Sequence, residues 1–583
     1  MSLHFSTPHP ADGRALRYHF DEFMLDWIRE LVGAIARGPK FDAAAEELSR
    51  EAVLMYLEQL LAIELHPVGH ELYRARYAAS RGQVPQPVAV PAPLAELIRQ
   101  SKSAAGVRVV SPAVADWQRA YRRARTHLRQ LLIRTLPAPS TANAVDSTIA
   151  VELVEGANPA GKCDAFWLAS GSIDPARVLF VLEPQNRTLV DVAESAAAVR
   201  RLGARLISVD PLIARKEGIN WWKPAVLPAW ADAMRGRLKS LPRSASGWLD
   251  RSLQRLARRV GFWEAFFRAH GVQAVQQFTE FSDETIAKRI AIGRVGGIEL
   301  GKQRSQFFER ASAAFYFRHE VVLLWHRNAL PFLVSGGTGA RYAVETGYVY
   351  GHLIDTLRAE GQALRSALAV RGATEVIAIF DAQAHPNTHF SLEQLRSFYG
   401  VALALARNRP QLGLIVKSKK PGIIASLGEE AREIEHLSRA GRCLIVDQPL
   451  TSVLSAALAA DVALGFPAST AACEAALAGC RVLLYDPSHS RLHPWAARDA
   501  GIMFQELEPF AAAAVRALDE AASGSRGTPR PRLLEIDPFL DHRAAQRAAE
   551  FLNAFLSARA GGASKDASVA SALRRCSHAI PVT

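Results

Sequence analysis

Apolar positions change their spacing along the chain, and the first change separates an N-terminal region from the rest. Up to about residue 81 apolar residues return every three or four positions, as in FDAAAEELSREAVLMYLEQLLAIELH, which is typical of amphipathic helices. A proline-rich break, GQVPQPVAVPAPL, precedes a basic helical stretch, ADWQRAYRRARTHLRQLLIRTL. We expect a helical N-terminal region over residues 1–142, serving as a packing or partner-docking unit.

Short β-rich runs separated by helical segments follow, which is the alternation of a parallel α/β sheet. RVLFVLEPQN, the helix LVDVAESAAAVRRLG and the strand ARLISVDP form one βαβ repeat, flanked by the strands STIAVELVEG and GVQAVQQF. AIGRVGGIELGKQRS, AAFYFRHEVVLLWH and LPFLVSGG continue as strand-like, glycine-bearing segments. This part predicts a first Rossmann-like domain over residues 143–345.

A second α/β series begins with the buried strand TEVIAIFDA and the helix SLEQLRSFYGVALALARN. QLGLIVKSKKP, RCLIVDQP, DVALGFP and RVLLYD are its further strands, and STAACEAALAG is the helix before the last of them. The order predicts a doubly wound parallel sheet, and thus a second Rossmann-like domain over residues 346–510. We expect residues 511–583 to be C-terminal helices that pack back on the assembly, ending in a loose tail.

An insertion over residues 211–260 departs from this alternation, because it is strongly basic and holds four tryptophans. These are Trp221, Trp222, Trp230 and Trp248. Basic residues interleaved with indoles are typical of a membrane-surface segment, where lipid phosphates attract the charge. A solvated basic face with its tryptophans packed inward is the other interpretation.

Charge and cysteine usage narrow the class of partner. The 583 residues include 70 Lys+Arg against 57 Asp+Glu, a formal charge of +13, which favours phosphorylated small molecules, lipid or nucleic acid as partners. RNA-binding and zinc-finger signatures are absent from the sequence, so we expect no nucleic acid. Five scattered cysteines without metal spacing, and no signal-peptide layout or long apolar stretch, predict a cytoplasmic chain.

Candidate chemistry gathers at the predicted strand ends of the second unit, where open parallel sheets bind ligands. Ser469 and Thr470 begin a helix, and hydroxyls with free N–H groups at a helix start bind anions. Glu474 lies one turn further, and Lys417 and Lys419 end a strand at the same edge. The alternative interpretations are a simple N-cap for Ser469 and Thr470, a solvated carboxylate for Glu474 and a solvated turn for the lysines.

A polar loop after the first strand of this unit is a second candidate. Asp381 ends the strand, and His385, Asn387 and His389 follow it as a predicted substrate or phosphate loop, or as a merely polar loop. Pro386 argues against a helix that would bring the two histidines onto one metal ion. Since no DxD-like acidic pair ends a strand, we expect no essential metal.

Together these segments resemble the donor-binding half of GT-B glycosyltransferases. FDAQAHPNTHFSLEQLRSFYGVALALARNRPQLGLIVKSKKP, AGRCLIVDQP, DETIAKRIAIGRVGGIELGKQRS and residues 464–486 are similar to bacterial surface-carbohydrate (capsule, O-antigen, lipopolysaccharide) biosynthesis proteins, over roughly residues 175–500. The resemblance implies two Rossmann-like domains facing a cleft. It also implies donor phosphate at Ser469 and Thr470, ribose at Glu474, and charge compensation by Lys417 and Lys419. A second glutamate ahead of Glu474, usual in that family, is missing.

The same resemblance places the acceptor on the first domain. Gly296, Gly297, Gln303 and Ser305 are its candidate acceptor-side residues, with a structural turn as the alternative for the glycines. The candidates for a catalytic base or nucleophile are Glu183, Asp210, Asp283 and Glu284, each of which is otherwise a solvated or capping carboxylate. We prefer Glu284 and Glu183.

The function that the resemblance implies is transfer of a sugar from a nucleotide-sugar donor to a surface polysaccharide or lipopolysaccharide, without a cofactor. His385-Pro386 and His493-Pro494 echo a motif of sialyltransferase-like enzymes, so CMP-linked donors stand beside UDP-linked ones. A relative of sugar-nucleotide epimerases or polyol-phosphate transferases is one alternative. A non-enzymatic protein that docks on the inner membrane surface through residues 211–260 is another.

Overall fold

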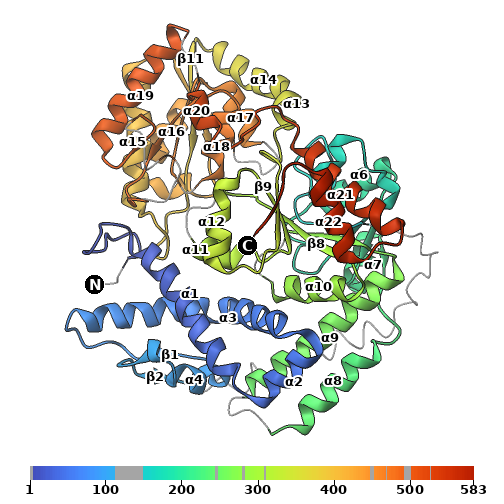
Figure 1. Ribbon diagram of the computed structural model, residues 1–583. Helices are drawn as coiled ribbons and strands as arrows, with labels where there is room; N and C mark the ends of the chain where they lie inside the picture. Colours follow the sequence, from blue (N-terminus) through green and yellow to red (C-terminus); the bar gives the residue numbers. More distant parts are fainter. Residues whose placement is uncertain are drawn as a thin grey trace.

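The computed structural model describes residues 4–111, 149–242, 247–278, 282–306, 310–446, 452–467, 469–490, 495, 501–524 and 527–582. Figure 1 shows the N-terminal helices in blue, a first sheet in teal to green, a second sheet in yellow to orange, and C-terminal helices in red that return to the first sheet. The basic helix expected over residues 115–136 lies outside the described residues.

The N-terminal region is helical, in keeping with its spacing of apolar residues. Its helices are α1 (Leu16–Ile35), α2 (Pro39–Leu48), α3 (Arg50–Ser80) and α4 (Ala92–Arg99), with a parallel pair of short strands, β1 (Val88–Ala89) and β2 (Val109–Val110). The long helix α3 packs against α1 and α2, and buries Tyr56 and Leu60 together with Phe20 and Trp27 of α1. This region has its own hydrophobic core, which it shares with one face of the first sheet.

The first sheet has the strand order β17-β10-β9-β8-β7-β3-β4-β5-β6, and its described strands are parallel except β17. Its strands are β3 (Ile149–Glu152), β4 (Val178–Leu182), β5 (Arg205–Ser208), β6 (Asn220–Trp221), β7 (Ala274–Gln277), β8 (Ile298–Lys302), β9 (Val321–Leu324), β10 (Tyr342–Glu345) and β17 (Ala579–Pro581). Its helices are α6 (Val192–Leu202), α7 (Pro211–Glu217), α8 (Ala229–Ser240), α9 (Trp248–Ala269), α10 (Asp283–Arg294), α11 (Arg310–Tyr316) and α12 (Leu330–Gly336). Since β3 and β7 are neighbours, the winding of the sheet reverses between them.

Two segments expected as strand-like are helical instead. AAFY lies in α11 and LPFLVSG forms α12, and the two helices pack against each other. Short apolar runs have no clear period, and Pro331 near the start of α12 fits the first turn of a helix. The strand in this stretch is the β-branched run VVLL of β9.

The second sheet has the order β13-β12-β11-β14-β15-β16 and is parallel throughout its described strands. Its strands are β11 (Glu375–Phe380), β12 (Leu412–Lys417), β13 (Cys443–Ile445), β14 (Val462–Gly465), β15 (Arg481–Tyr485) and β16 (Met503–Phe504). Its helices are α13 (Leu353–Thr356), α14 (Arg358–Ala369), α15 (Leu392–Asn408), α16 (Glu429–Arg439), α17 (Val453–Ala459), α18 (Thr470–Leu477) and α19 (Leu507–Ala522). The predicted doubly wound sheet is therefore confirmed.

The C-terminal segment is ordered rather than a loose tail. After α20 (Arg530–Leu533), the helices α21 (Ala544–Ala560) and α22 (Lys565–Arg575) pack on each other beside the first sheet (Figure 1). Strand β17 then pairs antiparallel with β10. Val569, Ala572 and Cys576 are buried, so the segment SVASALRRC has an apolar face that its serines and arginines conceal in the sequence.

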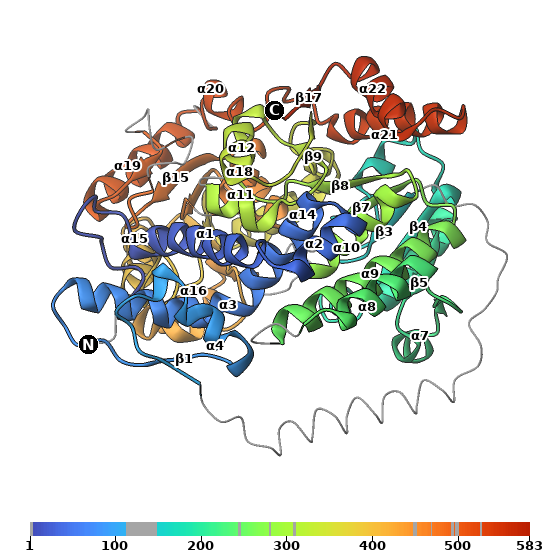
Figure 2. The same cartoon turned by 60° about the horizontal axis from the view of Figure 1, so that its bottom comes forward.

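Three tryptophan side chains of the basic insertion pack against the rest of the protein. Trp248 is buried and donates to Glu64, while Trp230 donates to Glu264 and Trp222 packs edge-on against Phe266. Figures 1 and 2 show α8 and α9 lying along the blue N-terminal helices. The prediction of a membrane-facing segment is wrong for these three indoles, because the helices use them to pack.

Candidate functional site

A cavity of about 640 Å³ opens at the carboxyl ends of the second sheet, next to residues of the first domain. β11 and β14 are neighbours although β12 and β13 lie between them in the sequence, and a crevice forms where the winding reverses in this way. The polar side chains in its lining include those of Arg304, Asp381, Lys417, Lys419, Ser469 and Thr470. We call it the interdomain cavity, because Arg304 follows β8 of the first sheet and the others belong to the second domain.

The start of α18 forms one wall of the interdomain cavity. Ser469 caps the helix by accepting a hydrogen bond from the N–H of Ala471 at 3.2 Å. Thr470 donates through Oγ1 to the carbonyl of Arg304 at 3.4 Å, which joins the two domains at this wall. A helix start with adjacent cations favours a negatively charged ligand.

The lysine turn after β12 is held in place by Asp381. Its two carboxylate oxygens accept from the Lys419 N–H at 2.6 Å and from the Tyr399 hydroxyl at 2.9 Å. Burial lowers the pKa of the Lys419 ammonium, and the charge of Lys420 lowers it further. An anion in the cavity would stabilise the charged form of Lys419, so the charge of this turn favours anion binding.

Glu474 is buried inside α18, one turn after Thr470. Its Oε1 accepts from the Tyr348 hydroxyl at 2.5 Å and from Lys162 Nζ at 3.2 Å, so both partners come from the first-domain side. Its Oε2 has no hydrogen-bond partner among the described residues. A buried carboxylate oxygen without a donor is unfavourable by roughly 1–3 kcal/mol, and a ligand hydroxyl would remove that deficit.

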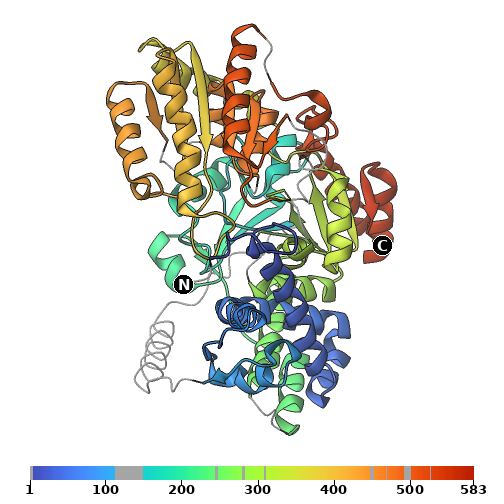
Figure 3. The same ribbon diagram turned by 90° about the vertical axis from the view of Figure 1, so that its left-hand side faces the viewer.

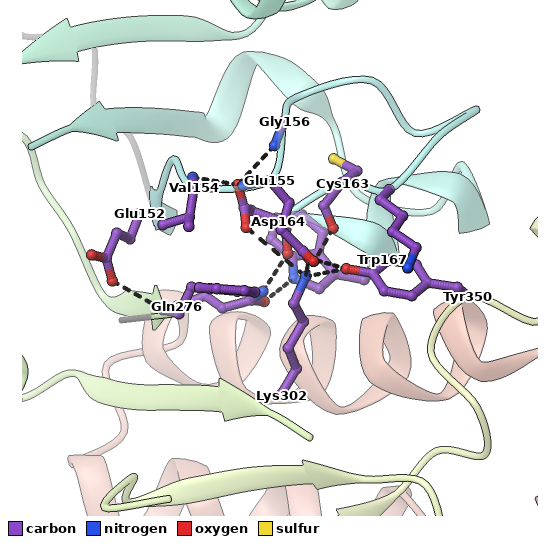
Figure 4. A network of polar contacts seen from close by, with 12 residues as sticks. Glu152, Val154, Glu155, Gly156, Cys163, Asp164, Trp167, Gln276, Lys302 and Tyr350 are labelled. Atoms are coloured by element: carbon purple, nitrogen blue, oxygen red, sulfur yellow. Dashed lines mark hydrogen bonds and ion pairs between the residues drawn. The ribbon is translucent and has the colours of Figure 1, made fainter. Parts of the chain in front are cut away.

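A cluster of ionisable groups lies in the first domain (Figure 4), and its loop is joined to α18 by the contact of Lys162 with Glu474. Lys302, the last residue of β8, donates to Glu155 Oε2 at 2.7 Å and to the Tyr350 hydroxyl at 2.6 Å. Tyr350 also donates to Glu155, and Asp164 lies 3.9 Å from Lys302. We call Glu155, Asp164, Lys302 and Tyr350 the carboxylate cluster.

Sequence reasoning missed the carboxylate cluster. The available signal was the acidic and basic content of VEGANPAGKCD after a predicted strand, together with the lysine that ends IELGK. Only the sheet order brings these segments together, because β3 and β8 flank β7.

The two preferred catalytic glutamates, Glu183 and Glu284, lie in ion pairs within the first domain. Glu183, which follows β4, is buried and pairs with Lys288 of α10. Burial raises its pKa to about 7, with the charge of Glu152 acting in the same direction. Glu284 pairs with Arg259 at 2.8 Å and accepts from the Trp263 indole at 2.6 Å.

The candidate acceptor-side residues divide into two pairs. Gly296 and Gly297 precede β8 at its amino end, where a Cβ on Gly297 would lie 2.4 Å from the Gln273 carbonyl oxygen. This close approach of two chain segments explains the glycine. Gln303 is buried and donates to the Ser305 carbonyl at 3.0 Å, and Ser305 lines the interdomain cavity.

The loop of His385, Asn387 and His389 contacts the N-terminal region. Asn387 accepts from Arg17 Nη1 through its carbonyl at 2.7 Å and from Arg74 through its side chain, while His389 packs against Tyr18 at 4.5 Å between ring centroids. Burial lowers the pKa of His389 to about 3, so its ring is neutral. The side chains of this loop do not line the interdomain cavity, whereas Asp381 does.

One group in the described part of the chain has the geometry of a metal site, and it lies in the N-terminal segment. Ligand atoms of His9, Asp12 and His19 fall within 4.8 Å of one another. Asp12 already pairs with Arg14 at 2.6 Å, and that cation opposes a metal ion. His493 and Pro494 lie outside the described residues.

None of the described helices has the length and apolarity needed to cross a lipid bilayer.

Comparisons with known proteins return structural neighbours. No protein-family model matches the sequence, and no curated protein matches it. Among solved structures, the chain is similar to UDP-GlcNAc 2-epimerase from Neisseria meningitidis bound to UDP-GlcNAc (12% identity, 70% of this chain and 99% of that one, TM-score 0.40).

The other neighbours include transferases. They are the wall teichoic acid polymerase TagF (9% identity, 75% of this chain and 98% of that one, TM-score 0.41) and a glycosyltransferase from Rickettsia africae (10% identity, 70% and 98%, TM-score 0.37). The strand orders of its own two sheets give this chain two Rossmann-like domains that face each other across the interdomain cavity, with an N-terminal helical region, which is a GT-B-like architecture.

Proposed function

We propose that this protein is a metal-independent glycosyltransferase that moves a sugar from a nucleotide-sugar to a surface polysaccharide or lipopolysaccharide acceptor. The observation that carries the proposal is the interdomain cavity, which combines a helix start with cations from both domains. Glu474, with one unsatisfied buried oxygen, follows directly behind that helix start. A phosphate and a polyhydroxyl group side by side match this set of groups.

In this proposal the donor phosphates lie at Ser469 and Thr470, with Lys417, Lys419 and Arg304 around them. When the bond between sugar and phosphate breaks, negative charge grows on the leaving phosphate. Fixed cations and helix N–H groups offset that charge without reorganising. This supply of positive charge from side chains supports transfer without a metal ion.

Glu474 is assigned to the ribose of the donor. In this assignment its Oε2, which has no hydrogen-bond partner among the described residues, accepts from a ribose hydroxyl, while Oε1 stays bonded to Tyr348 and Lys162. The ribose would then be read by a group that also ties the second domain to the first. Both UDP- and CMP-linked sugars carry the hydroxyls that this contact needs.

The acceptor class comes from the sequence resemblance to surface-carbohydrate biosynthesis proteins. The five cysteines are free and buried, which supports a cytoplasmic setting for the reaction. A nucleotide-sugar epimerase or a polyol-phosphate transferase would use the same cavity. Product analysis separates them, because only a glycosyltransferase releases nucleotide while forming a new glycosidic bond.

The first test is thermal stabilisation of the purified protein by UDP, GDP, CDP and CMP. A nucleotide at about 100 times its Kd should stabilise the protein by roughly 2.7 kcal/mol. We expect one nucleotide to raise the melting temperature, and Lys417→Met and Glu474→Gln to weaken that response at least tenfold in Kd. If no nucleotide stabilises the wild type, the proposed function is wrong.

Lys420→Met is the matched control for the lysine change. Lys420 lies in the same turn but does not line the interdomain cavity, so its replacement should leave nucleotide stabilisation close to that of the wild type. An equal loss in Lys417→Met and Lys420→Met would indicate a general charge effect instead of a site.

A further inference from the structure

The carboxylate cluster lies at the place where the first sheet is expected to bind its own ligand. Glu155 follows β3, and β3 borders β7 at the point where the winding reverses. Ligands of open α/β sheets bind beyond the carboxyl ends of the strands at such points. The first domain therefore presents Glu155 to a ligand in the way that the second domain presents its lysine turn.

The loop that carries Glu155 is held rigidly by Asp164. Its Oδ2 accepts from the N–H groups of Val154, Glu155 and Gly156 at 2.7, 2.9 and 3.2 Å. Figure 4 shows these three contacts converging on one carboxylate. A side chain on a loop fixed by three hydrogen bonds has little freedom to move away from a substrate.

Two partners hold the Glu155 carboxylate in its ionised form. Burial raises its pKa, but the charges of Lys302 and Lys162 outweigh burial, and the pKa lies below the usual value for glutamate. The Glu155 side chain is 23% exposed, whereas Lys302 and Asp164 are 1% exposed. Glu155 is thus the carboxylate of the cluster that reaches solvent.

Two short connections place this cluster next to the interdomain cavity. Lys302 precedes Arg304 by two residues, and Arg304 lines the cavity. Lys162 lies in the same loop as Glu155 and donates to Glu474. Glu474 follows Thr470 by one helical turn, and Thr470 lines the cavity. Glu155 therefore lies on the first-domain side of the site assigned to the donor.

We propose that Glu155 is the catalytic base of the first domain, which takes the proton from the acceptor hydroxyl during sugar transfer. This inference rests on the proposed function. In the step, the acceptor oxygen bonds to the anomeric carbon of the sugar, and the bond from that carbon to the phosphate oxygen breaks. The electron pair leaves with the nucleotide phosphate, and the acceptor proton passes to the Glu155 carboxylate. Lys302 and Tyr350 are positioning residues.

The test measures nucleotide release from UDP-, GDP-, CDP- and CMP-linked sugars, with water as the acceptor, because water loses a proton in the same way. We expect Glu155→Gln to lower kcat at least about 100-fold, the usual contribution of a general base, with unchanged nucleotide stabilisation. Glu155→Asp should recover part of the loss, and it serves in place of the glutamine variant if that variant does not fold.

Glu284→Gln is the matched control. Glu284 is also a first-domain glutamate with a cationic partner and an aromatic donor, and its side chain is 19% exposed. Its replacement should leave kcat within about twofold of the wild type, since both partners lie in α9 and Glu284 does not line the interdomain cavity. Equal losses in both variants would overturn the assignment of Glu155.

Lys302→Met separates positioning from catalysis. Glu155 faces Lys302, Tyr350, Asp164 and Lys162, and without Lys302 its pKa should rise. We expect the acid limb of the kcat/KM profile to move to higher pH in this variant and to vanish in Glu155→Gln. An unmoved limb would overturn the role of Glu155 as base.

The remaining outcomes also decide the question. If Glu155→Gln turns over donor like the wild type, Glu155 is not the base. If the wild type binds a nucleotide but turns over no donor sugar, the catalytic assignment fails and the binding site stands. If no nucleotide binds at all, the proposed function fails and this proposal fails with it.

Discussion

Three glutamates of the first domain differ in exposure and in their ion-pair partners. They are Glu155, Glu183 and Glu284. Lys302 and Lys162 keep Glu155 ionised at a partly exposed position. Glu183 is sealed in with Lys288, and Glu284 is tied to Arg259. The chemistry of a carboxylate follows from these neighbours, so residue type and position in the sequence do not identify a base.

The burial of Glu183 gives a pH dependence of stability. Its pKa is raised from the ordinary value near 4.5 to about 7, so the folded state binds this proton more tightly than the unfolded state. The stability from this group is present at low pH and is lost as pH rises towards 7. The glutamine in Glu183→Gln does not titrate, so this loss is absent from the variant. Its free energy of unfolding, compared with that of the wild type, should rise by about 1–3 kcal/mol as the pH increases from 5 to 8.

Urea denaturation of both proteins at pH 5, 6, 7 and 8 measures this difference. Asp164 has a pKa raised to about 7 as well, but it contributes equally to both proteins and cancels. Parallel curves for wild type and variant across this range would contradict the prediction.

At the scale of elements, the end of the chain completes the first domain. β17 covers the edge of β10, where the Glu345 N–H donates to the His578 carbonyl at 2.8 Å and the Val582 N–H donates to the Arg341 carbonyl at 3.0 Å. An uncovered edge strand presents unpaired backbone groups to other chains. The segment after α22 is thus part of the sheet, although it is more than 230 residues from β10 in sequence.

Truncation after Cys576 should destabilise the first domain and leave the nucleotide response intact. It removes the pairing of β17 with β10 and the backbone hydrogen bonds that flank it, each bond worth roughly 1 kcal/mol, and exposes the β10 edge. We expect a melting temperature lower by a few degrees and more aggregation by light scattering. Arg574→Ala, on the exposed side of α22, is the control and should melt like the wild type.

At the scale of the whole molecule, the N-terminal region contacts both Rossmann-like domains, and Figure 3 shows its helices below them. Towards the first domain, Tyr56 donates to Asp283 at 3.1 Å and Arg318 pairs with Glu58 at 2.7 Å. Towards the second, the Phe5 N–H donates to the Pro386 carbonyl at 2.8 Å. A region bonded to both domains restrains their relative motion.

The contacts of this region with the second domain are open to a direct test. Arg17→Ala combined with Arg74→Ala removes both side chains that bond to Asn387. We expect faster hydrogen exchange over residues 383–390, because that loop loses its outer cover. Arg76 donates to the Ser103 carbonyl at 2.9 Å and lies over the Phe23 ring, and both partners belong to the N-terminal region. Arg76→Ala should therefore leave exchange in the loop unchanged.

The pattern of residues along the chain predicts the kind of fold and the second-domain residues of the candidate site. Buried β-rich runs alternating with helices allow few arrangements other than parallel sheets, and their strand ends meet at one edge. For that reason Lys417, Lys419, Ser469 and Thr470, which are predicted from local patterns, all line one cavity. Local signals sufficed there because each group lies at the end of its own strand or the start of its own helix.

The residues that lie opposite these groups could not be predicted from local patterns, because long-range packing brings them there. Glu155, Lys302, Tyr350 and Glu474 come from four separate stretches of sequence, and their meeting depends on the order of strands and on how the two domains face each other. The burial of His389 also depends on long-range packing, because Tyr18 of the N-terminal helix α1 packs against its ring. Packing between distant segments sets the burial and the partners of each carboxylate, and these decide which carboxylate stays ionised and partly exposed.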